Sequence, residues 1–204
     1  MPPLKLPRRD AQLVQIVDAA FADAARRSGK WLLCGPGCTQ CCFGVFPINQ
    51  LDAARLKAGM TKLQAHEPAL AAAIRLRARQ SMARLRDDFP GDPETGILHE
   101  TPEADRRFSE FANDEPCPAL DPNSGKCDLY ASRPMTCRVF GPPVRSEHGL
   151  GVCELCYHGA TDQEIVACEM VPDPADLESK LLEQLEAASN RHGQTIVAHC
   201  LASE

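Results

Sequence analysis

Four cysteines within one short loop constrain this chain more than any other feature of its sequence. The loop is the run CGPGCTQCC, residues 34–42, in which the cysteines recur three and four positions apart before an adjacent pair. Gly35 and Gly37 leave the backbone free to curl and to aim N–H groups at the sulfurs, and Pro36 blocks a helix. One tetrahedral zinc ion or one cubane cluster needs four ligands. The loop therefore predicts a metal site, with candidate ligands Cys34, Cys38, Cys41 and Cys42.

The adjacent Cys41 and Cys42 are expected to point in different directions, so that one of them serves a second centre or stays a free thiol. Four ordinary buried cysteines are a weaker interpretation, because buried cysteines do not usually gather in a Gly/Pro loop. The C-x3-C-x2-C spacing also fits radical enzymes that leave one iron open for S-adenosylmethionine. Those enzymes continue into a βα barrel, whereas the residues that follow here have helical periodicity. We still expect that three cysteines of the loop could hold a cluster whose fourth position is open or is filled by a distant residue.

The remaining cysteines form two further groups. Cys117, Cys127 and Cys137 lie ten residues apart, and we expect them to share one centre with the loop. Cys153 and Cys156 have the knuckle spacing of zinc and iron sites, and Cys168 follows closely enough to join them. This second group is expected to form a separate centre or to extend the first, with His158, Cys42 or Cys200 as fourth ligand; the alternative is a set of idle thiols.

Eleven cysteines, an odd number in uneven clusters, favour metal ligands over disulfides. The first residues lack the apolar run of a signal peptide, and no stretch approaches the length of a membrane span, so we expect a cytoplasmic protein without membrane association. The net charge of −6 and the single Trp and two Tyr argue against nucleic acid as a partner. The partner is expected to be an unidentified protein or small molecule.

Apolar periodicity and capping residues predict a mainly α fold with one or two small β-hairpins. Helices are expected over about 10–27, 50–58, 69–88 and 101–111, and again after Asp173. Turn residues at 121–125 and around Glu147 predict hairpins beside Cys117 and over 144–152. We expect a single domain, 1–204, with a metal-binding core at 31–47 plus 115–170 and a C-terminal helix at 174–192.

Arginines offer candidate binding groups. Arg133 and Arg138 flank Cys137, and at least one is expected beside the site, where it offsets thiolate charge or binds an anionic group of a substrate. The alternative, of equal weight, is a salt bridge to Asp128 or a neighbouring carboxylate. A basic run on the helix at 69–88 is typical of a solvated face, although it could meet an acidic partner; its members are Arg75, Arg77, Arg79, Arg84 and Arg86.

Taken together, the motifs C-x3-C-x2-C-C, C-P-x-L and C-x-L-Y-x-x-R-P-x-x-C-R resemble the YkgJ-like cysteine-cluster family, a zinc- or iron-chelating domain. The resemblance implies a chelating set of Cys34, Cys38, Cys41, Cys42, Cys117, Cys127 and Cys137. The flagellin lysine methylases carry a similar motif, associated with a [4Fe–4S] cluster and methyl transfer, which favours iron–sulfur over zinc.

These observations predict a cysteine-ligated iron–sulfur or zinc protein of redox or group-transfer character, with [4Fe–4S] as the preferred cofactor. A structural zinc protein that serves as an interaction or assembly module is one alternative. A lysine-methylase-like enzyme that uses S-adenosylmethionine is another.

Overall fold

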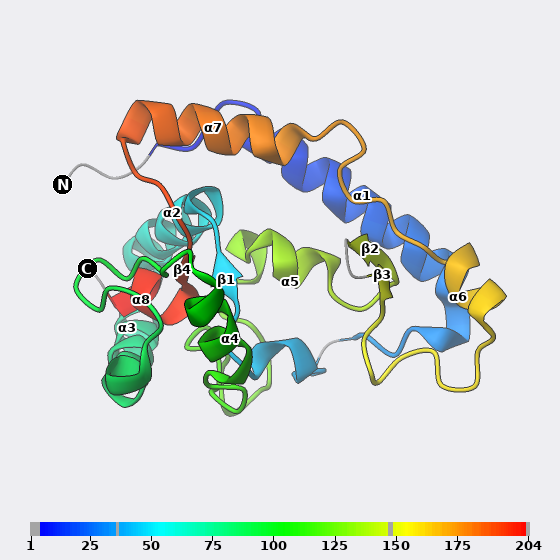
Figure 1. Cartoon of the computed structure of the whole chain (residues 1–204), viewed down its shortest axis with the longest axis horizontal. Helices are drawn as coiled ribbons and strands as arrows, with labels where there is room; N and C mark the ends of the chain where they lie inside the picture. The colour runs from blue at the N-terminus through cyan, green and yellow to red at the C-terminus, as the bar shows by residue number, and fades with distance from the viewer. Residues whose placement is uncertain (1–4, 36, 147–148, 203–204) are drawn as a thin grey trace. The chain divides into compact units, whose positions relative to one another are not determined.

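Helices dominate the structure, a computed structural model that describes residues 5–35, 37–146 and 149–202 (Figure 1). The helices are α1 (Asp10–Ser28), α2 (Gln50–His66), α3 (Pro68–Leu85), α4 (Pro102–Glu110), α5 (Met135–Val139), α6 (Asp162–Ala167), α7 (Leu177–Ser189) and α8 (Val197–Ala202). Two small antiparallel sheets join β1 (Pro47–Ile48) to β4 (Thr195–Ile196) and β2 (Val144–Ser146) to β3 (Gly149–Gly151). The prediction of a mainly α chain with small β-hairpins is confirmed.

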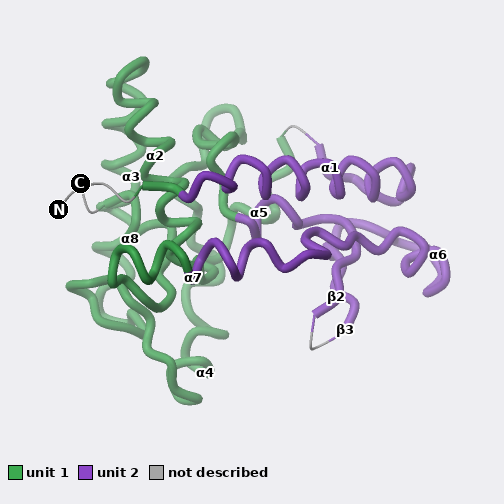
Figure 2. The backbone as a smooth tube through the Cα atoms, turned by 90° about the horizontal axis from the view of Figure 1, so that it is seen from above, with its two compact units in different colours: residues 1–6, 37–134, 184–204 green, residues 7–36, 135–183 purple. Residues whose placement is uncertain are grey.

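The chain divides into two compact units, coloured separately in Figure 2. Unit 1 comprises residues 1–6, 37–134 and 184–204, and unit 2 comprises residues 7–36 and 135–183. The cysteine-rich loop crosses from one to the other, since Cys34 belongs to unit 2 and Cys38 to unit 1; Pro36 lies outside the described residues. The expected single domain over 1–204 stays a prediction.

Unit 1 is built on α2, α3 and α8, which pack against one another. The Asn49 side chain begins α2 by accepting a hydrogen bond from the Asp52 N–H (2.9 Å), and Pro68 stands in the first turn of α3. Small residues on α3, among them Ala71 and Ala78, are fully buried and let the neighbouring helices approach closely. Burying such apolar faces supplies most of the stability of short helices.

Unit 2 is built on α1, whose buried face includes Leu13, Val17 and Ala24. Gly29 ends this helix with a positive φ of 50°, and its N–H bonds to the Ala25 carbonyl. The helix packs against α5. Farther along unit 2, the Thr161 side chain and Glu164 form a capping box at the start of α6.

Two helix boundaries differ from the sequence-based expectation. Helix α2 runs to His66, well beyond Ala58, because Met60 continues its buried face. The helix expected over 174–192 is α7, which the structure bounds at Leu177–Ser189. Asp176 and Asn190 adopt positive φ at its two ends, which α-helical backbone does not allow.

The helices within the described ranges include none that is both long and apolar enough to cross a membrane.

Candidate metal centre

Two segments far apart in sequence bring four cysteines into one region of unit 1. Cys41 and Cys42 lie in a 3₁₀ turn, Gln40–Cys42, and Cys117 stands at the start of a hairpin that Cys127 closes. The Cys117 N–H donates to the Cys42 carbonyl (2.8 Å). The next residue on each side, Phe43 and Pro116, forms an antiparallel bridge. Backbone pairing therefore holds the cysteine loop against the hairpin.

The hairpin itself forms as its turn residues predict. Leu120 and Cys127 pair antiparallel, and the Asp121 N–H donates to the Lys126 carbonyl (2.8 Å). The Asp121 carboxylate accepts from the N–H groups of Asn123 and Ser124, an Asx-type turn. The two cysteines at its base pack against the hydrophobic core of unit 1. The packing of the hairpin against this core therefore fixes the positions of both cysteines.

The two adjacent thiols interact directly. A hydrogen bond from the Cys42 thiol is the largest influence that lowers the pKa of Cys41, to about 6, and the Arg133 guanidinium lowers it further. The same hydrogen bond, together with burial and the negative charge on Cys41, raises the pKa of Cys42. The expectation that one of these two cysteines serves a second centre or stays a free thiol remains a prediction.

The hairpin thiols lie in a different environment. Burial raises the pKa of Cys117 to about 12, while hydrogen bonds from the Ala119 and Leu120 N–H groups to its sulfur oppose that rise. Burial also raises the pKa of Cys127, opposed first by the Leu129 N–H. The backbone therefore aims donors at both sulfurs, an arrangement that stabilises thiolate ligands. Burial by itself favours the protonated state of both thiols.

The donor set of this group suits a soft metal. Four sulfurs and no imidazole favour zinc or an iron–sulfur cluster over magnesium or calcium. Within the described part of the chain, no three His, Cys, Asp or Glu side chains are already gathered as a metal-holding group. Coordination by these cysteines therefore requires their side chains to rotate toward a common point.

The other predicted ligands are placed in different parts of the chain. Cys38 lies in unit 1 and is half-buried, whereas Cys34 and Cys137 belong to unit 2. The prediction that the whole loop and Cys137 share one centre therefore remains a prediction. Cys200 is buried in the core of unit 1, where its thiol donates to the Ala53 carbonyl (3.5 Å).

The two candidate arginines have different surroundings. Arg133 donates to the Tyr130 carbonyl (2.9 Å), stacks over the Tyr130 ring at 3.9 Å, and lies close enough to lower the pKa of Cys41. Arg138 is only 2% exposed, and its guanidinium binds the Asp18 carboxylate (2.8 Å). A carboxylate partner for Arg138 matches the salt-bridge alternative. A role in substrate binding remains a prediction for both residues.

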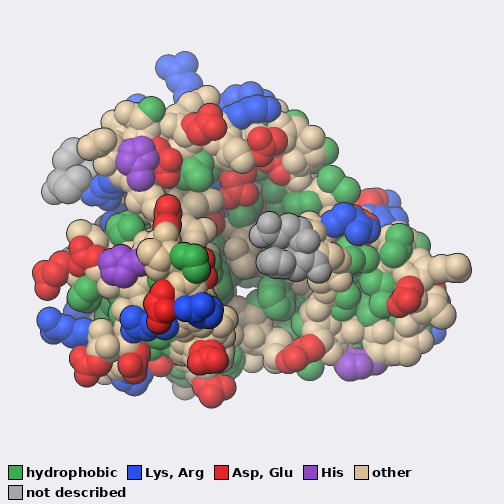
Figure 3. All heavy atoms as spheres, viewed as in Figure 1, with side chains coloured by type: hydrophobic (Ala, Val, Ile, Leu, Met, Phe, Trp, Pro, Cys, Tyr) green, Lys and Arg blue, Asp and Glu red, His purple; other side chains and the backbone are tan. Residues whose placement is uncertain are grey.

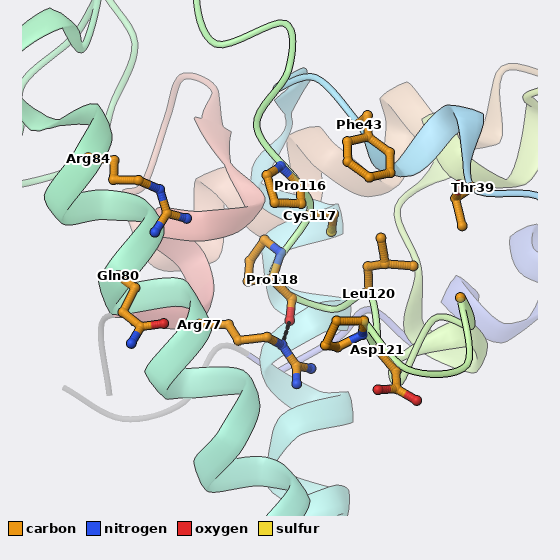
Figure 4. A pocket seen from close by; sticks show the side chains of 12 residues that line it. Thr39, Phe43, Arg77, Gln80, Arg84, Pro116, Cys117, Pro118, Leu120 and Asp121 are labelled. Carbon is orange, nitrogen blue, oxygen red and sulfur yellow. Dashed lines mark hydrogen bonds between the residues drawn. The ribbon is translucent and has the colours of Figure 1, made fainter.

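A cleft of about 480 Å³ beside Cys117 was not anticipated from sequence (Figure 4). Its walls include Phe43, Pro116 and Leu120, and α3 contributes arginines on the opposite side. Arg77 donates to the Pro118 carbonyl (2.8 Å) and pairs with Asp128 (2.6 Å). Part of the basic run on α3 thus contacts the hairpin and does not simply face solvent.

In unit 2, the second predicted group of cysteines is gathered into a buried cluster. The buried part of this cluster contains Cys153, Cys156 and Cys168, and the partly buried Cys34 packs against it. His158, one expected fourth ligand, is exposed. Cys34 was assigned from sequence to the first loop, and no spacing rule indicates its place in this cluster.

A family model agrees with the cysteine pattern. The model, CxxCxxCC, carries the description "Putative zinc- or iron-chelating domain" and matches residues 33–157, more than half of the chain. The chain belongs to this family. Its own motif departs from the family name in having three residues, not two, between Cys34 and Cys38, and Cys168 lies outside the matched range. Comparisons with curated proteins and with solved structures give no match.

Proposed function

We propose that this protein binds a metal centre through Cys41, Cys42, Cys117 and Cys127 and uses it in redox or group-transfer chemistry. One observation carries the proposal: these four half-buried sulfurs come from two distant segments that the backbone pairs together within unit 1. Membership of a zinc- or iron-chelating family supports metal binding in general. An iron–sulfur cluster bound here by four cysteines would accept and donate electrons.

The protein's own groups have separable roles in such a centre. The N–H groups of Ala119, Leu120 and Leu129 would hold the hairpin sulfurs as thiolates. Arg133 would offset part of the negative charge that several thiolates bring to one place, since its guanidinium acts on both Cys41 and Cys127. These groups position and stabilise the ligands, and none of them needs to exchange a proton.

The cleft supports a reactive centre over a purely structural one. A structural site is enclosed by its ligands and by packed residues, whereas here Cys117 lines an open cavity of about 480 Å³. Ligand sites are typically largely apolar with a few polar groups, and this cavity combines Phe43, Pro116 and Leu120 with Arg77 and Arg84 (Figure 4). A small molecule or an extended peptide could therefore approach the centre from this side.

A structural zinc site is the second candidate, favoured by the packing of Cys117 and Cys127 against the core of unit 1. Zinc would be colourless and redox-silent, and all four of its positions would be filled by sulfur. In that case the protein would act as an interaction or assembly module. We place either form in a reducing compartment, where the thiols stay free.

Anaerobic purification followed by metal analysis, sulfide analysis and absorption spectroscopy tests both candidates. We expect iron and sulfide in the parent protein, with a visible charge-transfer absorption that bleaches on reduction with dithionite. The Cys41→Ser/Cys42→Ser variant should lose this absorption and its metal. The Cys200→Ser variant, which removes a buried thiol at the core of the same unit, should retain both.

The outcomes separate the parts of the proposal. Zinc in place of iron, lost in the Cys41→Ser/Cys42→Ser variant, would support the structural candidate and exclude redox chemistry. An unchanged metal content in that variant would overturn the assignment of these cysteines as ligands.

A further inference from the structure

Unit 2 contains a second group of four cysteines, independent of the centre proposed for unit 1. Cys153, Cys156 and Cys168 are each no more than 5% exposed, and Cys34 is half-buried. Together with Tyr157, Trp31, Leu32, Ala160 and Ile165 they make one packed cluster. The four sulfurs come from three segments of the chain.

The first two segments are joined at the C-x2-C turn. The Cys156 N–H donates to the Cys153 carbonyl (2.9 Å), which closes a tight turn, and the Tyr157 N–H then bonds to the Trp31 carbonyl (2.9 Å). The Leu33 N–H points at the Cys156 sulfur at 3.4 Å. A chelating turn with a backbone N–H directed at one sulfur is the local geometry of structural zinc knuckles.

The third segment is fixed by hydrogen bonds on either side of Cys168. Arg27, near the end of α1, donates to the Ala167 carbonyl (2.6 Å) and to the Glu169 carbonyl (3.0 Å). The Cys168 N–H bonds back to the Ile165 carbonyl (3.0 Å) at the end of α6. The backbone that carries this cysteine is therefore held against α1 by a residue that does not belong to the cluster.

A glycine leaves room for the fourth sulfur. Gly141 has a φ of +121°, and a Cβ built on it would lie 2.7 Å from the Cys34 Sγ, far inside van der Waals contact. Its Cα thus borders the Cys34 sulfur closely. An L-residue here would be strained by the backbone and would also displace the sulfur.

The described part of unit 2 around the cluster contains little regular secondary structure. Between α5 and α7, the regular structure of the residues described on either side of 147–148 consists of two strands of three residues each and the six-residue α6. Large apolar side chains there stay exposed, among them Leu155 (40%), Val166 (52%) and Val171 (59%). Hydrophobic side chains accordingly gather on the surface over β2, β3 and α6 in Figure 3. Small irregular regions of this kind are commonly stabilised by a metal or by disulfides.

We propose that Cys34, Cys153, Cys156 and Cys168 form a second metal centre, contained within unit 2, that holds one structural zinc ion. Four thiolates in a largely dry setting match the closed tetrahedral site of structural zinc. The alternative, four packed thiols, does not account for the chelating turn and the N–H directed at Cys156. Binding releases the thiol protons and draws the four side chains inward, so the site forms with the metal.

Zinc content and ligand type are measured on the full chain, purified anaerobically with a thiol reductant. We expect one zinc ion per chain whose X-ray absorption shows sulfur ligands alone, at about 2.3 Å. The Cys153→Ser/Cys156→Ser variant should lose this zinc. The Cys41→Ser/Cys42→Ser variant should keep it, and so should the Cys200→Ser control.

A more conservative substitution tests the site in case the double variant does not fold. Cys168→His retains a zinc ligand, so cobalt bound in place of zinc should remain tetrahedral while its visible bands shift toward those of a mixed sulfur and nitrogen site. A zinc content per chain that is unchanged in the Cys153→Ser/Cys156→Ser variant, or cobalt bands unchanged by Cys168→His, would overturn the proposal.

The same variants keep this proposal separate from the one for unit 1. Loss of all metal in both double variants would mean a single shared centre and would also overturn a second site. Failure of the Cys41→Ser/Cys42→Ser variant to lose metal would affect only the centre proposed for unit 1.

Discussion

At the scale of single residues, the Cys41–Cys42 pair shows how one hydrogen bond separates two chemically identical thiols. The Cys42 thiol donates to Cys41, which favours the thiolate of Cys41 and disfavours ionisation of Cys42. Above the pKa of Cys41, the negative charge of the pair therefore lies on Cys41. In a metal-binding loop, one thiolate is then ready to bind before the other has lost its proton.

This arrangement predicts the pH dependence of alkylation in metal-free protein. The thiolate is the nucleophile, so the rate at Cys41 should rise as pH increases through its pKa of about 6. Cys42→Ala removes the donor and should raise the midpoint toward the ordinary cysteine value. Arg133→Ala should raise it less, because the guanidinium is the weaker of the two influences. Iodoacetamide pulses with tandem mass spectrometry would measure the midpoints, and one unmoved by Cys42→Ala would contradict this interpretation.

At the scale of elements, Arg77 connects α3 to the hairpin that carries two of the proposed ligands. Its guanidinium donates to the Pro118 carbonyl (Figure 4). It also pairs with Asp128, the residue directly after Cys127. The pair is largely shielded, with the Arg77 side chain 24% and the Asp128 side chain 12% exposed. One side chain thus anchors the hairpin close to both of its cysteines.

Replacement of this anchor should destabilise unit 1. Arg77→Ala removes hydrogen bonds that involve charged groups, and we expect a loss of about 1.5–3 kcal/mol in the free energy of unfolding. Arg79→Ala, at an exposed position of the same helix, should change it by no more than about 0.5 kcal/mol. Urea titration of both variants under reducing conditions measures the difference. Equal midpoints for the two variants would show that the anchor contributes nothing.

Local structure could be predicted at this scale because its causes are local. Asn49 and Thr101 each cap a helix that the sequence indicated, and the Asp121 turn forms the hairpin beside Cys117. Each of these contacts joins residues only a few positions apart. Their geometry follows from side-chain chemistry without knowledge of the fold.

The parts of the site that escaped prediction depend on distant contacts. Nothing in the spacing of Cys34 indicates that it packs against the cluster that contains Cys156. The hydrogen bond from the Leu33 N–H to the Cys156 sulfur joins residues that only the tertiary structure brings together. The contact of Arg77 with Pro118 is of the same kind. The sequence therefore indicated the type of ligand, cysteine, but it did not indicate which cysteines lie together in the fold.

At the scale of the whole molecule, two compact units each contain their own cluster of cysteines. A ligand that binds only the folded state stabilises it by about 4 kcal/mol when its free concentration is a thousand times its dissociation constant. Metal bound in each unit should therefore stabilise that unit in particular. Loss of metal should therefore destabilise two separate stretches of sequence, one in each unit.

Removal of metal tests this expectation through amide hydrogen exchange. Treatment with a strong chelator should speed exchange in the hairpin at 117–128 and in the segment at 153–168, because both lose the ion that holds their side chains together. Cys41→Ser/Cys42→Ser should reproduce only the first change, and Cys153→Ser/Cys156→Ser only the second. The α2 helix, buried by its own apolar face, provides an internal reference that should respond least. If exchange in both stretches is unchanged after metal removal, the stability of these stretches does not depend on metal. If either double variant alone speeds exchange in both stretches, the two clusters act as one.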